Sequence, residues 1–171
     1  QQTVADRRDI DFVLYEQLKA EELLTHDRYA DMNRKMLDMI ITEARKLAIN
    51  EILPISEEAD RVGVTFKDNT VTVPECYRKP YELMKEGEWI ALTEDPEIGG
   101  QGLPQIIAQA IMDYFGGPGF SFLAFGGCAH GSAKMIELFG TDEQKKLYME
   151  KMYAGTWGGT MVLTEADAGS D

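Results

Sequence analysis

Apolar side chains recur at helical spacing through the first half of this chain, and this periodicity restricts the fold more than any other feature. Four of them fall within residues 9–24, namely Ile10, Val13, Leu14 and Leu18. A longer stripe follows, made of Tyr29, Met32, Met36, Ile40, Ala44 and Leu47. Such stripes predict amphipathic helices around a core, the second of them ending at Pro54. A methionine-rich stripe can also form a promiscuous binding surface, but we favour core packing.

Between residues 63 and 73 the apolar period changes from the helical value to two. Val64, Phe66, Val71 and Val73 alternate with polar residues around Asp68-Asn69. This alternation predicts a short hairpin. Pro74 then suits the first turn of a helix, which we expect to end at Gly87.

Glycine and proline divide the second half into segments. Residues 89–104 form a glycine-rich turn region, and Pro104 suits the start of a helix with a buried stripe up to Tyr114. Residues 116–119, Gly-Gly-Pro-Gly, predict a break before a further helix over residues 120–139. Thr141 and Gln144 have capping-box spacing, which predicts a last helix to about Tyr153. The expected fold is therefore mainly α, a helical bundle with one small hairpin, followed by an apolar strand near Met161.

Composition excludes several classes of protein. The formal charge of −13 opposes nucleic-acid binding, which requires a basic surface. The sequence has no apolar run of the roughly 18–20 residues that a membrane span needs and no apolar signal core near its start. Cys76 and Cys128 lie far apart without metal or redox spacing, so we expect reduced thiols in a cytoplasmic protein.

The sequence offers no complete active site. Its two histidines are His26, in a polar connection, and His130, within an expected helix. A single histidine inside a helix is more often structural than catalytic. Most carboxylates fall on polar helix faces, and no group has metal-ligand spacing.

Two glycine-rich stretches each allow two interpretations. Gly99, Gly100 and Gly102 could surround a phosphate, but the preceding strand and the lysine of a P-loop are missing, which favours a tight turn. The run of small residues from Gly126 to Ala133 costs helix stability. It therefore predicts either close helix packing or an apolar slot wide enough for an acyl chain.

The last eleven residues, 161–171, are typical of an apolar strand that leads into a ligand-binding loop. Thr164 and Ser170 supply hydroxyl groups, and Gly169 lets a ligand approach the main chain, which suits a flat, phosphate-bearing cofactor. Three carboxylates also lie here, those of Glu165, Asp167 and Asp171. We expect them to face solvent or to bond turn amides, because they would otherwise repel a phosphate.

Several motifs together resemble one family. Residues 89–104, Trp-Ile-Ala-Leu-Thr-Glu-Asp-Pro-Glu-Ile-Gly-Gly-Gln-Gly-Leu-Pro, look like the signature turn of acyl-CoA dehydrogenases. Residues 139–145, 155–158 and 163–171 follow in that family's order and spacing. Residues 8–18 resemble the N-terminal extension of a larger subfamily that includes the 3-methylmercaptopropionyl-CoA dehydrogenases.

The resemblance implies a helical N-terminal domain over residues 1–157, with an extension at 1–27, and the start of a truncated middle β domain at 158–171. It implies FAD-dependent oxidation of an acyl-CoA thioester to the 2,3-enoyl-CoA, with loss of an α proton and transfer of a β hydride to flavin N5. The family's base is a glutamate of a C-terminal helical domain, so no catalytic residue is assigned here. Electron-transfer flavoprotein as electron acceptor and a homo-oligomeric parent are further implications.

By the same resemblance, the residues expected to bind FAD are Met161, Leu163, Thr164, Gly169 and Ser170, and Ser170 is also expected to contact the acyl-CoA. Ala166 stands where the family commonly has proline, which should soften the loop. Two alternatives remain open. One is an acyl-CoA oxidase or related flavoenzyme on the same fold, and the other is a non-catalytic helical interaction module.

Overall fold

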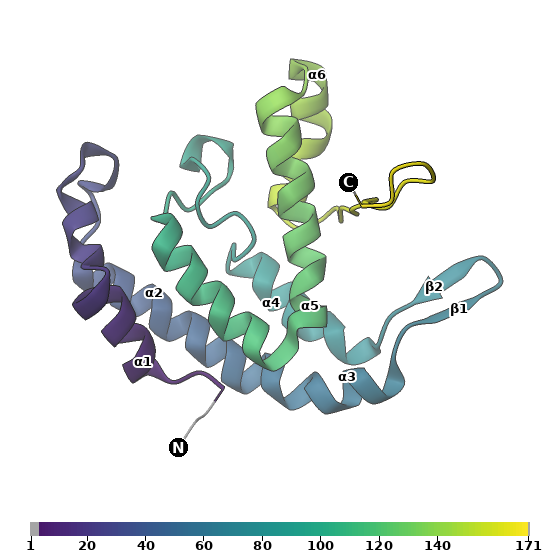
Figure 1. Cartoon of the computed structure of the whole chain (residues 1–171), viewed down its shortest axis with the longest axis horizontal. Helices are drawn as coiled ribbons and strands as arrows, with labels where there is room; N and C mark the ends of the chain where they lie inside the picture. Colours follow the sequence, from purple (N-terminus) through teal and green to yellow (C-terminus); the bar gives the residue numbers. More distant parts are fainter. Residues whose placement is uncertain (1–3, 171) are drawn as a thin grey trace.

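A computed structural model describes residues 4–170 as a mainly helical body with one small hairpin, which confirms the expected fold class. The helices are α1 (Arg7–Asp11), α2 (Arg34–Leu47), α3 (Ser56–Val62), α4 (Arg78–Glu86), α5 (Gln105–Phe139), α6 (Asp142–Gln144) and α7 (Glu150–Tyr153). The strands are β1 (Thr65–Lys67) and β2 (Thr70–Thr72). Figure 1 shows α1, α2 and the first half of α5 side by side, while the second half of α5 rises away from them. Within residues 4–170, no helix has both the length and the apolar character for a membrane crossing.

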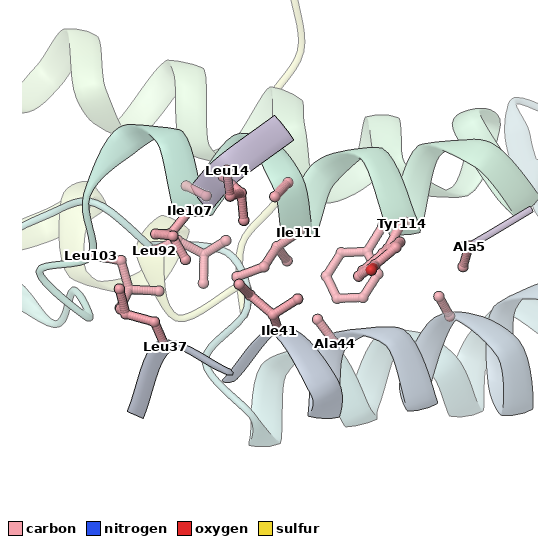
Figure 2. Close-up of a cluster of buried hydrophobic side chains, with 14 of the residues drawn as sticks. Ala5, Leu14, Leu37, Ile41, Ala44, Leu92, Leu103, Ile107, Ile111 and Tyr114 are labelled. Atoms are coloured by element: carbon pink, nitrogen blue, oxygen red, sulfur yellow. The ribbon is translucent and has the colours of Figure 1, made fainter. Parts of the chain in front are cut away.

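The core lies chiefly between α2 and the first half of α5. In Figure 2, Leu37, Ile41 and Ala44 of α2 face Ile107 and Ile111 of α5. Leu92 and Leu103, from the loop before α5, close one end of this cluster. Because these side chains are almost completely buried, they supply most of the hydrophobic stabilisation of this half of the chain.

Helix α2 differs from its prediction in two ways. Its fully buried face is Leu37, Ile41 and Ala44 and continues to Ile52. The predicted stripe is confirmed at Ala44 and in part at Met32, Ile40 and Leu47, which are half-buried and pack against the core, whereas Met36 is 40% exposed. Pro54 does not end the helical path. The chain continues with π-type bonding over Ala48–Ile52 and a 3₁₀ turn over Leu53–Ile55 into α3. Pro54 is tolerated because it occupies the first turn of that 3₁₀ segment, where no helical N–H partner is required.

The N-terminal helix is shorter than predicted. Helix α1 continues as a π-helix over Phe12–Gln17, and Lys19 then adopts a left-handed conformation with φ of 49°. Short 3₁₀ segments follow at Ala20–Thr25 and Asp27–Tyr29. The reversal at Lys19 ends the regular helical period, so Leu14 is buried whereas Leu18 is exposed.

The hairpin forms where the alternation predicted it. Phe66 pairs with Val71, and Asp68 and Asn69 have φ of 50° and 59°, as a two-residue hairpin turn with positive φ at both positions requires. Figure 1 shows the hairpin projecting from the helices. Its apolar side chains are all exposed, those of Phe66 and Val71 among them.

The break predicted at residues 116–119 is present as a kink, at which two helical stretches of α5 meet. Gly119 alone leaves helical geometry, with φ of −161° and ψ of 65°. The hydroxyl of Ser56 donates a hydrogen bond to the Pro118 carbonyl at this bend. The kink redirects the second half of α5 and so opens space between its two halves. The capping box at Thr141 and Gln144 is present as predicted.

The strand expected near Met161 is absent from the described residues, which corrects that prediction. Residues 158–164 are irregular, and a single antiparallel bridge joins Glu165 to Gly169. A strand needs a partner to satisfy its backbone groups. The described residues provide none beside this segment, so its apolar side chains remain exposed, with Met161 at 74%.

Candidate functional site

A cavity of about 120 Å³ lies between the residue 89–93 segment and the two halves of α5. Its apolar walls come from Met84, Trp89, Ile90, Ala108, Met112 and Leu123. Complete small-molecule sites usually measure roughly 300–1,000 Å³. The cavity can therefore hold one apolar part of a ligand.

The glycine-rich turn before α5 positions the cavity wall. The N–H of Gln101 donates to the Ala91 carbonyl at 2.9 Å, and that of Leu103 donates to the Leu92 carbonyl at 2.8 Å. These bonds fold residues 99–103 back on residues 91–95. A Cβ added at Gly100 would overlap the backbone of Glu94, so only glycine permits this approach.

The same turn does not form a phosphate cradle. The N–H groups of Gly99, Gly100 and Gly102 donate to the carbonyls of Pro96, Asp95 and Glu94, at 3.2, 3.0 and 2.8 Å respectively. No glycine amide of this turn is left to receive a phosphate oxygen. The structure therefore supports the tight-turn interpretation of residues 99–102.

The small residues of α5 pack against the following helices at one position and line the cavity at another. Ala133 packs with Met149 and Tyr153 in a second buried cluster beneath the short helices that follow. Gly126 and Gly127, one turn or more earlier, line the cavity. A Cβ at Gly127 would meet no atom within 4 Å, so this position leaves open space at the cavity wall.

A buried carboxylate adjoins the cavity. Glu94 is 3% exposed and accepts hydrogen bonds from the Thr93 hydroxyl at 3.1 Å and the Thr93 N–H at 3.3 Å. His130 Nε2 lies 2.9 Å from Glu94 Oε1, and Lys134 Nζ lies 3.6 Å from the same oxygen. Burial raises the pKa of Glu94, but His130, Thr93 and Lys134 outweigh it and lower the pKa to about 2. Glu94 is therefore an anion at neutral pH.

The charges continue from Glu94 along α5. Lys134 also contacts both carboxylate oxygens of Glu137, at 2.9 and 3.0 Å. The hydroxyl of the buried Tyr153 donates to Glu137. This chain of contacts ties the loop before α5 to α5 itself and to α7, and it fixes the wall that His130 presents to the cavity.

The sequence did not reveal this pair of residues. His130 was expected to be structural, and Glu94 was considered only as part of a turn motif. The available signal was a carboxylate two residues after the apolar segment 90–92, where a buried acid needs a cation or donor nearby. Sequence spacing alone could not identify His130, 36 positions later, as that partner.

The residues predicted to bind FAD lie elsewhere, on the terminal segment. Thr164 and Ser170 flank a turn that is closed by two backbone hydrogen bonds between Glu165 and Gly169. The Glu165 N–H donates to the Gly169 carbonyl at 2.7 Å, and the Gly169 N–H donates to the Glu165 carbonyl at 3.0 Å. Gly169 has φ of 62°. Met161 and Leu163 precede this turn and are exposed. None of these five residues lines the cavity.

Two of the three carboxylates near this turn can be placed. Glu165 and Asp167 are exposed, and their side chains make no hydrogen bond to the described residues. Asp171 lies outside the described residues. Across residues 4–170, no group of three or more His, Cys, Asp or Glu side chains could hold a metal ion.

A helical domain with this turn, capped helix and apolar cavity is of the acyl-CoA dehydrogenase type. The family model described as acyl-CoA dehydrogenase, N-terminal domain, matches residues 35–156. The chain therefore belongs to the acyl-CoA dehydrogenase family.

Relatives with named activities match nearly the whole chain. It is 32% identical over 166 residues to the broad-specificity linear acyl-CoA dehydrogenase FadE5 of Mycobacterium tuberculosis, covering 96% of the chain and 27% of the relative. It is 28% identical over 164 residues to 3-methylmercaptopropionyl-CoA dehydrogenase of Ruegeria pomeroyi, covering 96% and 28%. A butyryl-CoA dehydrogenase of Syntrophomonas wolfei is 30% identical over 168 residues, with coverage of 96% and 27%. The chain thus spans little more than a quarter of these relatives' length.

Proposed function

We propose that this chain is the N-terminal part of an FAD-dependent acyl-CoA dehydrogenase, which oxidises an acyl-CoA thioester to the 2,3-enoyl-CoA. The apolar cavity beside the family's signature turn is the observation that carries this proposal. The names of the relatives, which are acyl-CoA dehydrogenases, support the same activity.

In this proposal the cavity receives the alkyl part of the acyl group. Trp89, Ile90 and Met112 exclude water from it, and burial of each methylene of the substrate contributes about 0.8 kcal/mol. Gly126 and Gly127 let the chain pass close to the α5 backbone. The residues described here thus bind and orient the acyl group, while the base that removes the α proton belongs to another part of the protein.

The terminal segment is the part of the chain that fits FAD. The Thr164 and Ser170 hydroxyls have no hydrogen-bond partner among residues 4–170, and both are exposed beside a glycine with positive φ. In the proposal, Thr164 and Ser170 donate to the cofactor, Met161 and Leu163 cover its ring, and Ser170 also contacts the acyl-CoA. When bound, FAD accepts the hydride from the β carbon. Gly169 contributes its backbone conformation and not a hydrogen bond to the cofactor, because its N–H already donates to the Glu165 carbonyl.

The remaining expectations belong to the same proposal. Residues 1–157 would form the helical domain, with the extension at 1–27, and residues 158–171 would begin the β domain. Electron-transfer flavoprotein would accept the electrons from a homo-oligomeric enzyme. Both cysteines are free, which supports a reducing, cytoplasmic environment.

The test is anaerobic mixing of the intact flavoprotein with acyl-CoA thioesters while the visible flavin absorbance is followed. A dehydrogenase binds FAD, loses its yellow colour on mixing, and passes the electrons to electron-transfer flavoprotein. A colourless protein that leaves acyl-CoA unchanged would contradict the proposal and favour the non-catalytic module. Rapid formation of hydrogen peroxide in air would instead identify the oxidase alternative.

A further inference from the structure

The cavity is apolar on most sides but carries polar groups on one wall. Thr93 and His130 line it next to the buried Glu94, while Gln105 and Gln109 lie at its exposed side. A cavity shaped only for a hydrocarbon chain has no use for a fixed hydroxyl and imidazole in its wall. These two side chains are also held in place, because both are bonded to Glu94.

Glu94 determines which hydrogen-bonding groups this wall offers. The Thr93 hydroxyl donates its only proton in the hydrogen bond to Glu94 Oε1, at 3.1 Å. In a neutral imidazole, the Nε2 nitrogen that lies 2.9 Å from Glu94 carries the ring proton. The carboxylate is only an acceptor, so it takes both protons.

Two hydrogen-bond acceptors of this wall have no donor among residues 4–170. The Thr93 oxygen keeps free lone pairs, and His130 Nδ1 has no hydrogen-bond partner among residues 4–170. Lys134, the nearby cation, is directed to Glu94 and Glu137 and does not line the cavity. Thr93 and His130, the two polar side chains held by Glu94, therefore accept hydrogen bonds. They suit a ligand group that donates a hydrogen bond.

We propose that this cavity selects acyl groups that carry a hydroxyl substituent away from the thioester, with Thr93 and His130 as the specificity-determining residues. This inference rests on the proposed function, and it narrows the substrate class. A hydroxyl donates to one of the two acceptors. An ether or ketone oxygen in the same place meets the lone pairs of these two acceptors, and an alkyl chain gives neither acceptor a hydrogen bond.

The test compares kcat/KM of the intact flavoenzyme for acyl-CoA thioesters of matched length that end in a hydroxyl, methoxy, ketone or methyl group. The hydroxyacyl thioester is expected to exceed the methyl and methoxy thioesters by about tenfold or more, the equivalent of one hydrogen bond to a positioned group.

Substitutions then assign the selectivity to the wall. Thr93→Val keeps the shape and removes the hydroxyl, and His130→Phe keeps a flat ring without nitrogen. Each is expected to lower the hydroxyl-to-methyl ratio severalfold while oxidation of the methyl-ended thioester continues. Thr156→Val is the matched control, because the Thr156 hydroxyl bonds the Lys151 carbonyl outside the cavity. It should leave the ratio unchanged.

The outcomes separate the two proposals. If no acyl-CoA of any kind reduces the flavin, the proposed function fails. If methyl-ended thioesters are oxidised as well as hydroxylated ones by the unsubstituted enzyme, only the hydroxyl selectivity fails. This second result needs no variant, so a folding defect in Thr93→Val or His130→Phe cannot obscure it.

Discussion

Glu94 is the residue whose ionisation most affects the stability of this domain. The carboxylate is buried against His130 and Lys134, and its pKa falls from 4.5 to about 2. A carboxyl group with a lowered folded-state pKa stabilises the protein above its unfolded-state pKa, and this stabilisation is lost as the pH falls through the folded-state value. The relevant window is therefore from pH 4.5 down to about 2.

We expect Glu94→Gln to lower the free energy of unfolding at neutral pH by about 3 kcal/mol, because it removes the charge that His130 and Lys134 face. The difference from the unsubstituted protein should shrink below pH 4.5. Urea unfolding across this pH range measures it. Glu97→Gln, on the exposed part of the same loop, is the control and should change the free energy by less than about 0.5 kcal/mol. Equal effects of the two substitutions would show that Glu94 is not paired.

Two buried tyrosines offer a second comparison. The Tyr114 hydroxyl is buried and has no hydrogen-bond partner among residues 4–170, whereas that of Tyr153 donates to Glu137. Tyr114→Phe should therefore leave the free energy of unfolding unchanged or raise it by about 1 kcal/mol, and Tyr153→Phe should lower it by about 1–2 kcal/mol. Thermal unfolding of both variants measures the difference. A loss of stability in Tyr114→Phe would reveal a partner for that hydroxyl.

At the scale of elements, Arg7 makes the largest set of polar contacts from the N-terminal segment, which is also held by the Tyr15–Asp38 and Arg45–Ala5 hydrogen bonds and by the buried Leu14. Arg7 bonds Asp11 at 2.6 Å, the Asp38 carboxylate at 2.7 Å and the Thr42 hydroxyl at 2.8 Å. Arg8 is its neighbour in sequence, yet it is exposed and its side chain forms no such bond. The two arginines therefore form a matched pair.

We expect Arg7→Met to loosen this segment without unfolding the domain, because its other contacts with α2 remain. Amide hydrogen exchange should accelerate over residues 7–17 and remain slow in α2 and α5, because local openings cost less than global unfolding. Arg8→Met should leave the exchange pattern unchanged. Accelerated exchange throughout α2 after Arg7→Met would show that the segment and the core unfold together.

The elements also show what could be predicted from sequence. The hairpin and the Thr141 cap follow from local chemistry, so their residues identified them. The Gly-Gly-Pro-Gly pattern likewise located the kink at Gly119, whereas the path beyond Pro54 and the contact between Ser56 and Pro118 depend on tertiary structure, which no local pattern encodes. For the same reason the pairing of Glu94 with His130 was missed, because it joins a loop to a helix far along the chain.

At the scale of the whole molecule, the cavity proposed for the acyl group and the residues predicted to bind FAD lie in different regions of the chain. The cavity lies among the helices, and the predicted FAD-binding residues lie on the exposed terminal segment. Figure 1 shows this segment and the hairpin extending from the helical body. The family motifs predicted both regions. The missing strand at residue 161 reflects tertiary context, since no neighbouring strand is available to it among residues 4–170.

The acyl group is proposed to occupy the cavity between the signature turn and α5, and the chain-length profile of Gly127→Leu is a test of this placement. The added side chain has open space at the cavity wall, so it should shorten the cavity without disturbing the helix. Gly131→Leu is the matched control, because Gly131 also has open space but does not line the cavity.

The measurement is kcat/KM of the intact flavoenzyme across straight-chain acyl-CoA thioesters of increasing length. We expect Gly127→Leu to lower kcat/KM for the longer thioesters by about tenfold or more and to leave the shortest nearly unaffected, since blocking one or two methylenes costs roughly 1–3 kcal/mol. Gly131→Leu should either leave kcat/KM unchanged or change it equally for thioesters of every length. If Gly127→Leu and the unsubstituted enzyme have the same length profile, the acyl group binds elsewhere.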